Sequence, residues 1–357
     1  MGVLKFALSV VASLVLAYSM LWGALAMWFK LPVPEMAKYA VIGVFLIPGL
    51  FALVHLFTHK SRHSLLIYTS FFAALFLWWL TIDPPAEGDW APELARQVTG
   101  TIDDDVLTLD GVRSFKWHSE DDMTENWSTR TYDLSKLETL DLFLSYWGDP
   151  KMAHFMLSFG FGNDEYLAWS IEVRRVKGGA YSPIADFFKA NPLVILAAEE
   201  SDVVGMRSNI WENDVHIFRL DVPKENMRML LEGYVRDANL LAEEPHWYNS
   251  ISTNCSTVVF RTIAALGIKI PFDWRIIVNG YLPEWLFERG SLNTDYSVEE
   301  LRELGRIADR ARATGLTDGF SVAGSNSCFY AALQRLAAPV RLLLEQSLRF
   351  QSDGFEL

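Results

Sequence analysis

The sequence predicts three membrane-spanning helices followed by a water-soluble α+β domain. Three long apolar segments precede Asp83 in this chain of 357 residues. The balance of charge also changes there: residues up to Asp83 include five Lys or Arg and two Asp or Glu, whereas the rest includes 26 and 42. Segments with strand periodicity then come before most of those with helix periodicity, which is typical of the α+β class.

Each of the three apolar segments is close to the length that a membrane-spanning helix needs, about 20 residues. Residues 6–29 carry no charge, 39–57 contain only His55 as an ionisable group, and 64–82 contain none. We therefore expect residues 1–83 to form a membrane anchor with these three helices.

Basic residues between the second and third helices predict the orientation. The connection from His59 to His63 contains Lys60 and Arg62, and basic loops stay in the cytoplasm. The N-terminus is then cytoplasmic, and the domain after the third helix lies outside the cytoplasm. A signal-peptidase site at residues 24–26 is the alternative, and cleavage there would leave the domain on the same side.

Beyond the anchor, residues 84–99 begin with prolines and predict a short linker. We expect the main soluble domain at 100–270 and a helical extension at 271–357. Alternating apolar residues predict strands at 137–147, 154–161, 167–176, 193–198, 203–206 and 215–220. Helical periodicity predicts helices at 223–241, 255–266, 297–313 and 333–348.

Composition excludes several functions. The acidic domain lacks the basic stripe that nucleic-acid binding requires. The two cysteines, Cys255 and Cys328, form neither a disulfide framework nor a zinc motif, so we expect no metal and no cofactor. One disulfide between them remains open, and it would consume Cys255.

Cys255 is the candidate nucleophile. It follows the capping residues Thr253 and Asn254 and precedes an apolar helical run that Gly267 would end. A first helical turn favours the thiolate, which is the form of cysteine that attacks carbonyl carbon. The alternative is a small buried apolar side chain beneath a helix start.

A thiol nucleophile needs a base, and His154 is the best placed histidine. If the hairpin of 154–161 and 167–174 is symmetric about Asn163, His154 lies opposite Glu172. Their Cβ atoms are then about 5 Å apart, and the carboxylate can hold the imidazole Nδ1–H. The alternative is a solvated strand face with a cross-strand ion pair. The predicted polar face consists of His154, Met156, Ser158, Ser170, Glu172 and Arg174.

Several short sequence motifs occur in order between residues 112 and 267, and together they resemble the Lnb N-terminal periplasmic domain family. The motifs are Val112 to Phe115, Tyr146 to Gly148, His154 to Phe161, Ser170 to Arg174, Tyr248 to Asn249, and Asn254 to Thr257. The resemblance implies a permuted papain-like (NlpC-type) thiol fold. It also implies roles for three residues: Cys255 as nucleophile, His154 as base and Glu172 as the residue that orients the base.

The resemblance further implies a bacterial inner-membrane protein with a periplasmic catalytic domain. The named family member is a lipoprotein N-acyltransferase, so we expect a thiol acyltransferase or lipid hydrolase that forms a Cys thioester from phospholipid or lipoprotein acyl esters. The membrane helices of that enzyme follow its domain, whereas here they precede it, which leaves the substrate open. A cysteine peptidase or amidase acting on cell-wall peptides, or a non-catalytic envelope module, are the alternatives.

Further residues are candidates for contacts with substrate. The backbone N–H of Cys255 is the expected first oxyanion donor, and Asn254 or Ser170 is a candidate second donor. Arg174 would meet a lipid phosphate or form an ordinary salt bridge.

Overall fold

The computed structural model describes residues 3–58, 61–162, 164–317 and 320–321, and these form two compact units. The first, here the anchor unit, contains the chain up to Ala91 together with residues 173–193 and 244–253. The second, here the sheet unit, contains the remainder from Pro92 onward. The units therefore exchange chain segments instead of following one another along the sequence.

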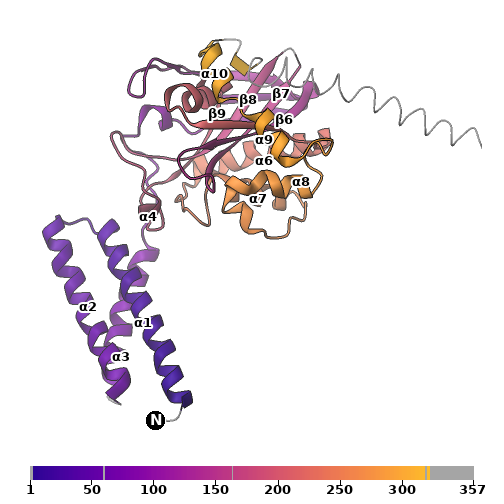
Figure 1. The fold of residues 1–357 in the computed structure, drawn as a ribbon. Coiled ribbons are helices and arrows are strands. Elements are labelled where there is room, and N and C mark those ends of the chain that lie inside the picture. Colours follow the sequence, from indigo (N-terminus) through magenta and orange to yellow (C-terminus); the bar gives the residue numbers. More distant parts are fainter. Residues whose placement is uncertain (1–2, 59–60, 163, 318–319, 322–357) are drawn as a thin grey trace, which may run out of the picture. The chain divides into compact units, whose positions relative to one another are not determined.

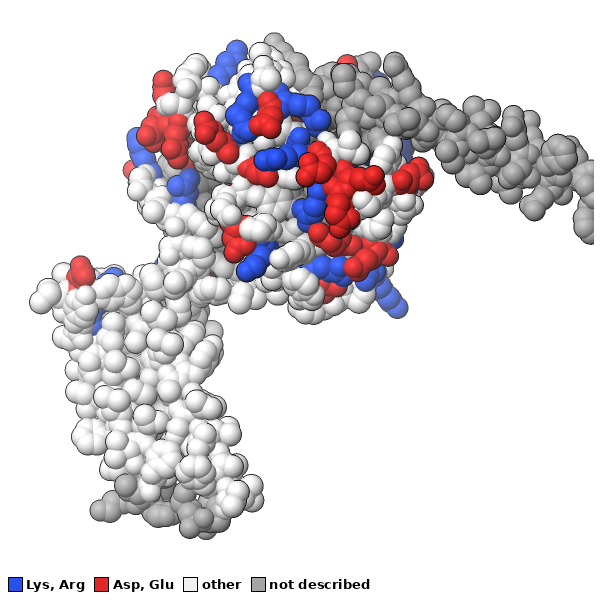
Figure 2. All heavy atoms as spheres, viewed as in Figure 1, with Lys and Arg blue, Asp and Glu red and all other residues white. Residues whose placement is uncertain are grey.

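Three helices make up most of the anchor unit and confirm the three predicted apolar helices. They are α1 (Val3–Lys30), α2 (Glu35–Thr58) and α3 (Ser61–Leu80), and each is long and apolar enough to cross a membrane. Leu16, Phe45 and Tyr68 are buried in the seam between them, while large apolar side chains such as Phe51 face outward. Outward apolar surface of this kind suits a lipid environment. Figure 2 shows few charged side chains on these helices.

An eight-stranded sheet organises the described part of the sheet unit. Its order is β1-β2-β9-β8-β7-β6-β10, with β5 paired to β2. β2 and β9 pair in parallel, whereas β6, β7 and β8 form an antiparallel meander. The strands are β1 (Thr99–Asp103), β2 (Val106–Arg113), β5 (Trp127–Asp133), β6 (Leu137–Tyr146), β7 (Ala153–Phe161), β8 (Glu165–Val173), β9 (Leu193–Ala198) and β10 (Asp214–Arg219), with β3 (Lys116–Trp117) and β4 (Met123–Thr124) as a separate pair.

Helices cover both faces of the sheet. α6 (Lys224–Glu243) contacts β1 and β6, and α7 (Cys255–Ala265) contacts α6 and β7 (Figure 1). α5 (Glu200–Gly205), the π-helical turn η3 (Met206–Ile210) and α10 (Ala308–Thr314) lie on the other side, where Val203 and Ala311 share a core cluster with Met156. The remaining elements are α4 (Pro183–Asp186) in the anchor unit, α8 (Leu282–Glu288), α9 (Val298–Gly305) and the 3-10 turns η1 (Pro92–Leu94), η2 (Leu134–Lys136), η4 (Trp274–Ile276) and η5 (Asn279–Tyr281).

Five of the six predicted strands and the first two predicted domain helices are present within a few residues of their expected bounds. The prediction of a strand at 203–206 is wrong, because these residues end α5 and begin η3. The predicted helix at 297–313 is two helices, since Arg306 is extended and pairs with His216 of β10. The predicted helix at 333–348 lies outside the described residues.

The alternative interpretation, a solvated polar face on the β7–β8 hairpin, is wrong. Met156, Ser158 and Ser170 are buried, because α5 and α10 cover this face. Polar side chains on it are therefore desolvated and must find partners within the protein.

Candidate active site

The start of α7 places Cys255 in a well-capped first turn. The Oδ1 atom of Asn254 accepts hydrogen bonds from the backbone N–H groups of Ser256 (3.1 Å) and Thr257 (2.9 Å), and Thr257 Oγ1 accepts one from the Asn254 N–H. This capping box confirms the predicted helix start. Cys255 is buried at the positive end of the helix dipole. Cys328 lies outside the described residues.

The β7–β8 hairpin brings His154 and Glu172 together. Its register pairs Met156 with Ser170 and Phe161 with Glu165, which confirms the predicted symmetry about position 163. His154 and Glu172 stand just beyond the last of these pairs, with His154 Nε2 3.1 Å from Glu172 Oε1. The predicted contact between the carboxylate and Nδ1 is wrong, because Nε2 faces the carboxylate.

Ser170 connects the two side chains. Its hydroxyl donates to Glu172 Oε1 (2.6 Å) and lies 2.7 Å from His154 Nε2. Since the hydroxyl proton points to Glu172, the oxygen accepts from a protonated Nε2, and Nδ1 is the nitrogen left for the side-chain hydrogen bond between His154 and Cys255. Ser170 therefore links the imidazole to the carboxylate, and its hydroxyl donates to Glu172 instead of being free for the expected oxyanion.

Arg207 joins the hydrogen-bonded row formed by His154, Ser170 and Glu172. Its Nη2 donates to Glu172 Oε1 (2.6 Å), its Nη1 donates to the Val203 carbonyl (2.7 Å), and its side chain is buried. Burial by itself would raise the pKa of Glu172, but the Arg207 guanidinium and the His154 imidazole outweigh it and hold that pKa well below the usual range. Burial by itself would lower the pKa of His154, but the Glu172 carboxylate outweighs it, and the net pKa lies above the usual value.

Arg207 was not predicted as a site residue, because the neighbouring residues were expected to form a strand. In η3 the side chain instead projects from a helical segment that lies on the sheet. Arg174, which was considered as a cation on the same face as Glu172, belongs to the anchor unit, where its guanidinium lies 4.8 Å from the centroid of the Trp90 ring. The salt-bridge partner of Glu172 is thus Arg207.

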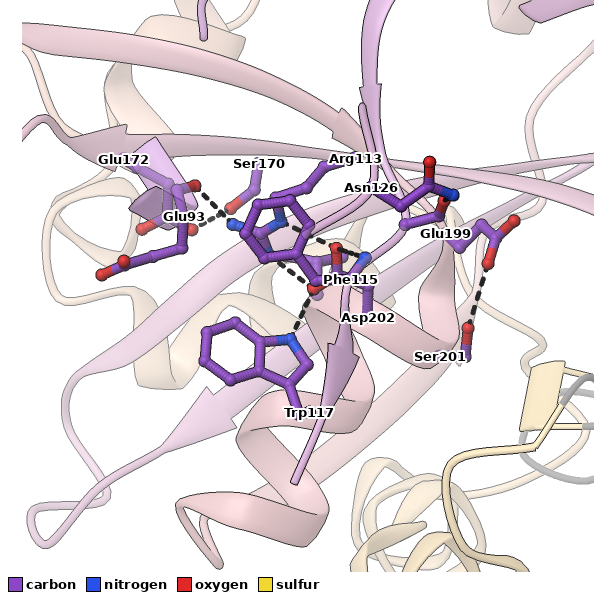
Figure 3. Close-up of polar contacts among 12 residues, drawn as sticks. Glu93, Arg113, Phe115, Trp117, Asn126, Ser170, Glu172, Glu199, Ser201 and Asp202 are labelled. Atoms are coloured by element: carbon purple, nitrogen blue, oxygen red, sulfur yellow. Dashed lines mark hydrogen bonds and ion pairs between the residues drawn. The ribbon is translucent and has the colours of Figure 1, made fainter. Parts of the chain in front are cut away.

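A second buried ion pair fixes the helix that leads into Arg207. Asp202 of α5 accepts hydrogen bonds from Arg113 Nε (2.8 Å) and Nη2 (2.9 Å), from the Phe115 N–H (2.9 Å) and from Trp117 Nε1 (2.8 Å). Figure 3 shows Asp202 surrounded by these donors. Arg113 Nη1 also donates to the Glu93 carbonyl (2.7 Å). This network holds α5, and with it η3, against the sheet.

Asn279 was also missed, because it follows the predicted end of the catalytic domain. Its Nδ2 lies 3.8 Å from Cys255 Sγ, and its Oδ1 accepts from the Ala153 N–H at 2.9 Å. The next residue, Gly280, donates to the Lys151 carbonyl, and a Cβ there would lie 2.1 Å from the Pro150 carbonyl oxygen. Only glycine allows the two backbone segments to come this close, and their contact holds Asn279 beside the start of β7. An Asn-Gly pair signals a turn, but nothing in the sequence indicated a partner for Cys255.

Comparison with known proteins agrees with this part of the structure. Residues 123–280 match the family model described as the Lnb N-terminal periplasmic domain, so this part of the chain is similar to that family. The match contains His154, Glu172, Arg207, Cys255 and Asn279. A search of curated proteins and a search of solved structures gave no match. A periplasmic domain and three apolar helices fit a membrane-anchored protein with a periplasmic module.

Proposed function

We propose that the protein is a membrane-anchored thiol acyltransferase or lipid hydrolase that works through a thioester on Cys255. The observation that carries the proposal is the connected row from Arg207 through Glu172 and Ser170 to His154, which has a hydrogen bond with Cys255. The chain order of histidine, glutamate and cysteine also fits the permuted papain-like (NlpC-type) arrangement.

In the first step the Cys255 thiol passes its proton to His154 Nδ1, and the sulfur attacks the carbonyl carbon of an acyl ester. The bond from carbon to the alcohol oxygen then breaks, and the leaving alcohol takes the proton from His154. In the second step an amine or water attacks the thioester carbonyl carbon and loses a proton to His154. The bond from carbon to sulfur then breaks, and the Cys255 sulfur takes that proton back from His154 as the acyl product leaves. Glu172 remains ionised throughout, because its pKa lies well below the usual range, and it stabilises the imidazolium.

Two groups near the sulfur suit the negative oxygen that forms in each step. The Cys255 N–H lies in the first turn of α7, where backbone N–H groups have no carbonyl partner within the helix. Asn279 Nδ2 is a second donor, already held in place by its Oδ1 contact. Asn254 was the earlier candidate for this role, but its side-chain oxygen caps the helix, and Asn279 has the direct contact with sulfur.

A lipid or lipoprotein substrate follows from the setting of the domain. The family description places the domain in the periplasm, and three apolar helices anchor the chain. We propose the bacterial inner membrane, with the N-terminus in the cytoplasm. A reporter fused after Leu357 should be active in the periplasm, and activity confined to the cytoplasm would overturn this topology.

Intact mass spectrometry after incubation with a native lipid extract tests the chemistry. We expect an adduct with the mass of an acyl chain on Cys255, lost in Cys255→Ser and released by hydroxylamine. Cys328→Ser is the matched control and should keep the adduct. No adduct, together with cleavage of cell-wall peptide by the wild type but not by Cys255→Ser, would identify an amidase instead. The absence of both reactions would favour a non-catalytic module.

A further inference from the structure

Two loops of the anchor unit pack on the ends of its helices. These are residues 173–193 and 244–253, and we call them the collar. Phe188 is buried against Ala26 and Trp79, and its ring stacks on Phe29 with centroids 5.5 Å apart. The collar is therefore part of the apolar core of the helices.

Polar contacts fix the depth of the collar along α3. Lys189 Nζ donates to the carbonyls of Trp79 (2.8 Å) and Ile82 (3.0 Å), and Trp247 Nε1 donates to the Ile82 carbonyl (3.1 Å). The last carbonyls of a helix have no partner within it, so these bonds mark its end. The end of a spanning helix lies where hydrocarbon meets lipid head groups, and Trp and Lys are typical of that depth.

The two loops also hold each other. Ser250 Oγ donates to the Pro183 carbonyl (2.9 Å), and the Tyr248 N–H donates to the Asn191 carbonyl (3.0 Å). Lys30 of α1 joins them, because its Nζ donates to the Lys189 carbonyl (2.8 Å) and lies 4.3 Å from the centroid of the Trp247 ring. The collar is thus one structure tied to two spanning helices.

The tips of the collar, residues 178–188 and 247–253, expose apolar side chains and no charged side chain. Ile184 is 60% exposed and Ile251 is 51% exposed, with Tyr181 and Phe187 exposed nearby in the sequence. Between Gly178 and Phe188 the sole charged residue is Asp186, which is buried. An uncharged apolar surface at the depth of a helix end matches the boundary between head groups and acyl chains.

We propose that the collar tips, with Ile184 and Ile251 at their centre, insert into the lipid interface on the side where α3 ends. Both collar segments lead directly into the candidate site, since Val173 follows Glu172 and Thr253 precedes Asn254.

Spin labels test the proposal in the full-length protein, reconstituted in nanodiscs of phosphatidylethanolamine and phosphatidylglycerol. Ile184→Cys and Ile251→Cys are labelled in a background in which Cys255 and Cys328 are replaced by Ser. Phe51→Cys on α2 is the lipid control, and Glu120→Cys on an exposed loop of the sheet unit is the water control. The readout is the collision rate with oxygen, which concentrates in lipid, against that with a water-soluble nickel chelate.

We expect both collar labels to favour oxygen over nickel, as Phe51→Cys does, and Glu120→Cys to show the opposite ratio. A nickel-accessible ratio at both collar sites would overturn the proposal. Protection from both reagents would overturn it as well, because it would show that protein, not lipid, covers the tips. The readout does not depend on catalysis, so it is independent of the proposed thioester chemistry.

Discussion

Two buried arginine–carboxylate pairs flank the same helical segment of the sheet unit, and they differ in where their hydrogen bonds lead. Asp202 accepts from Arg113, from a tryptophan N–H and from a backbone N–H, so its bonds end within the scaffold. Glu172 accepts from Arg207, but it also contacts Ser170 and His154. The Asp202 pair is closed, because its hydrogen bonds reach only structural groups. The Glu172 pair is open, because its hydrogen bonds continue to the His154 imidazole, which can accept and release a proton.

The difference separates a structural ion pair from one in the proposed active site more clearly than burial does. Arg113 and Arg207 are both buried, as is Asp202, and Glu172 is largely so. Burying a charge is costly unless it is paired, so burial alone explains only why each arginine has a carboxylate. The contact of the second pair with His154 is what connects it to the proposed chemistry.

His154→Ala should have the largest effect, because it removes the imidazole that the open pair contacts and that is the proposed general base. General bases contribute about 10²–10⁴-fold, and we expect a loss of turnover of about 10³-fold or more. Alkylation of Cys255 by iodoacetamide should slow but persist, since a cysteine without a base still reacts slowly with this reagent. Turnover close to the wild-type rate, with circular dichroism unchanged, would exclude His154 as the base.

Asp202→Ala should mainly reduce stability. It leaves the Arg113 guanidinium buried without a counter-charge, which typically costs about 3–5 kcal/mol in the free energy of unfolding. Urea denaturation of the protein in detergent measures this. A stability loss below about 1 kcal/mol would show that the closed pair is not the anchor of α5.

Asn279→Ala removes the second proposed oxyanion donor, and such a loss costs about 10²-fold or more in kcat. The rate of Cys255 alkylation should change little, because that reaction forms no oxyanion. Gly280→Ala is a matched variant: the new Cβ would displace the loop, so its effect on kcat should be similar. A large drop in alkylation with Asn279→Ala would instead indicate that the amide supports the thiolate.

Glu172→Gln should lower turnover by about 10²-fold, less than His154→Ala, since the amide oxygen can still accept hydrogen bonds but no longer stabilises the imidazolium. Because that oxygen can also still accept from Arg207, we expect stability to fall by only about 1–2 kcal/mol. If Glu172→Gln lowers the free energy of unfolding more than Asp202→Ala does under the same conditions, the Asp202 pair is not the more structural of the two.

Arg207→Lys should have the smallest effect, seen in the pH dependence. Arg207 holds the pKa of Glu172 low, and lysine cannot reproduce its two directed bonds. The pKa of Glu172 should then rise, so the carboxylate becomes protonated at a higher pH. The acid limb of the kcat profile should therefore move to higher pH, with the maximal rate changed by less than about tenfold. An unchanged acid limb would assign that limb to another group.

Features that depend on residues close together in the chain could be predicted from the sequence. Apolar length predicted α1 to α3, and alternation together with a turn predicted the register that brings His154 to Glu172. The capping residues at Asn254 predicted the start of α7. Each of these depends on residues within one helix or hairpin, where periodicity and capping apply directly.

The partners from distant segments could not be predicted. Arg207 and Asn279 reach the site only because α5 and the loop before α8 fold back onto β7 and β8, and neither contact leaves a period or a motif. The strands from β1 to β5 were missed as well. β3 and β4 have two residues each, and β1 and β5 contain few apolar residues, so tertiary pairing, not propensity, makes them strands. β2 has eight residues with Leu107 and Leu109 buried in alternation, a signal that could have predicted it.

The exchange of segments between the units has a consequence for biosynthesis. α1 to α3 leave the ribosome first, but the anchor unit also needs Phe188, Lys189 and Trp247, which come after most of the sheet strands. At about 5–20 residues per second, translation from Leu80 to Thr253 takes on the order of ten to thirty seconds. During that interval the ends of α1 and α3 lack their collar contacts. The packing of these helices is therefore completed only after the collar residues have been synthesised.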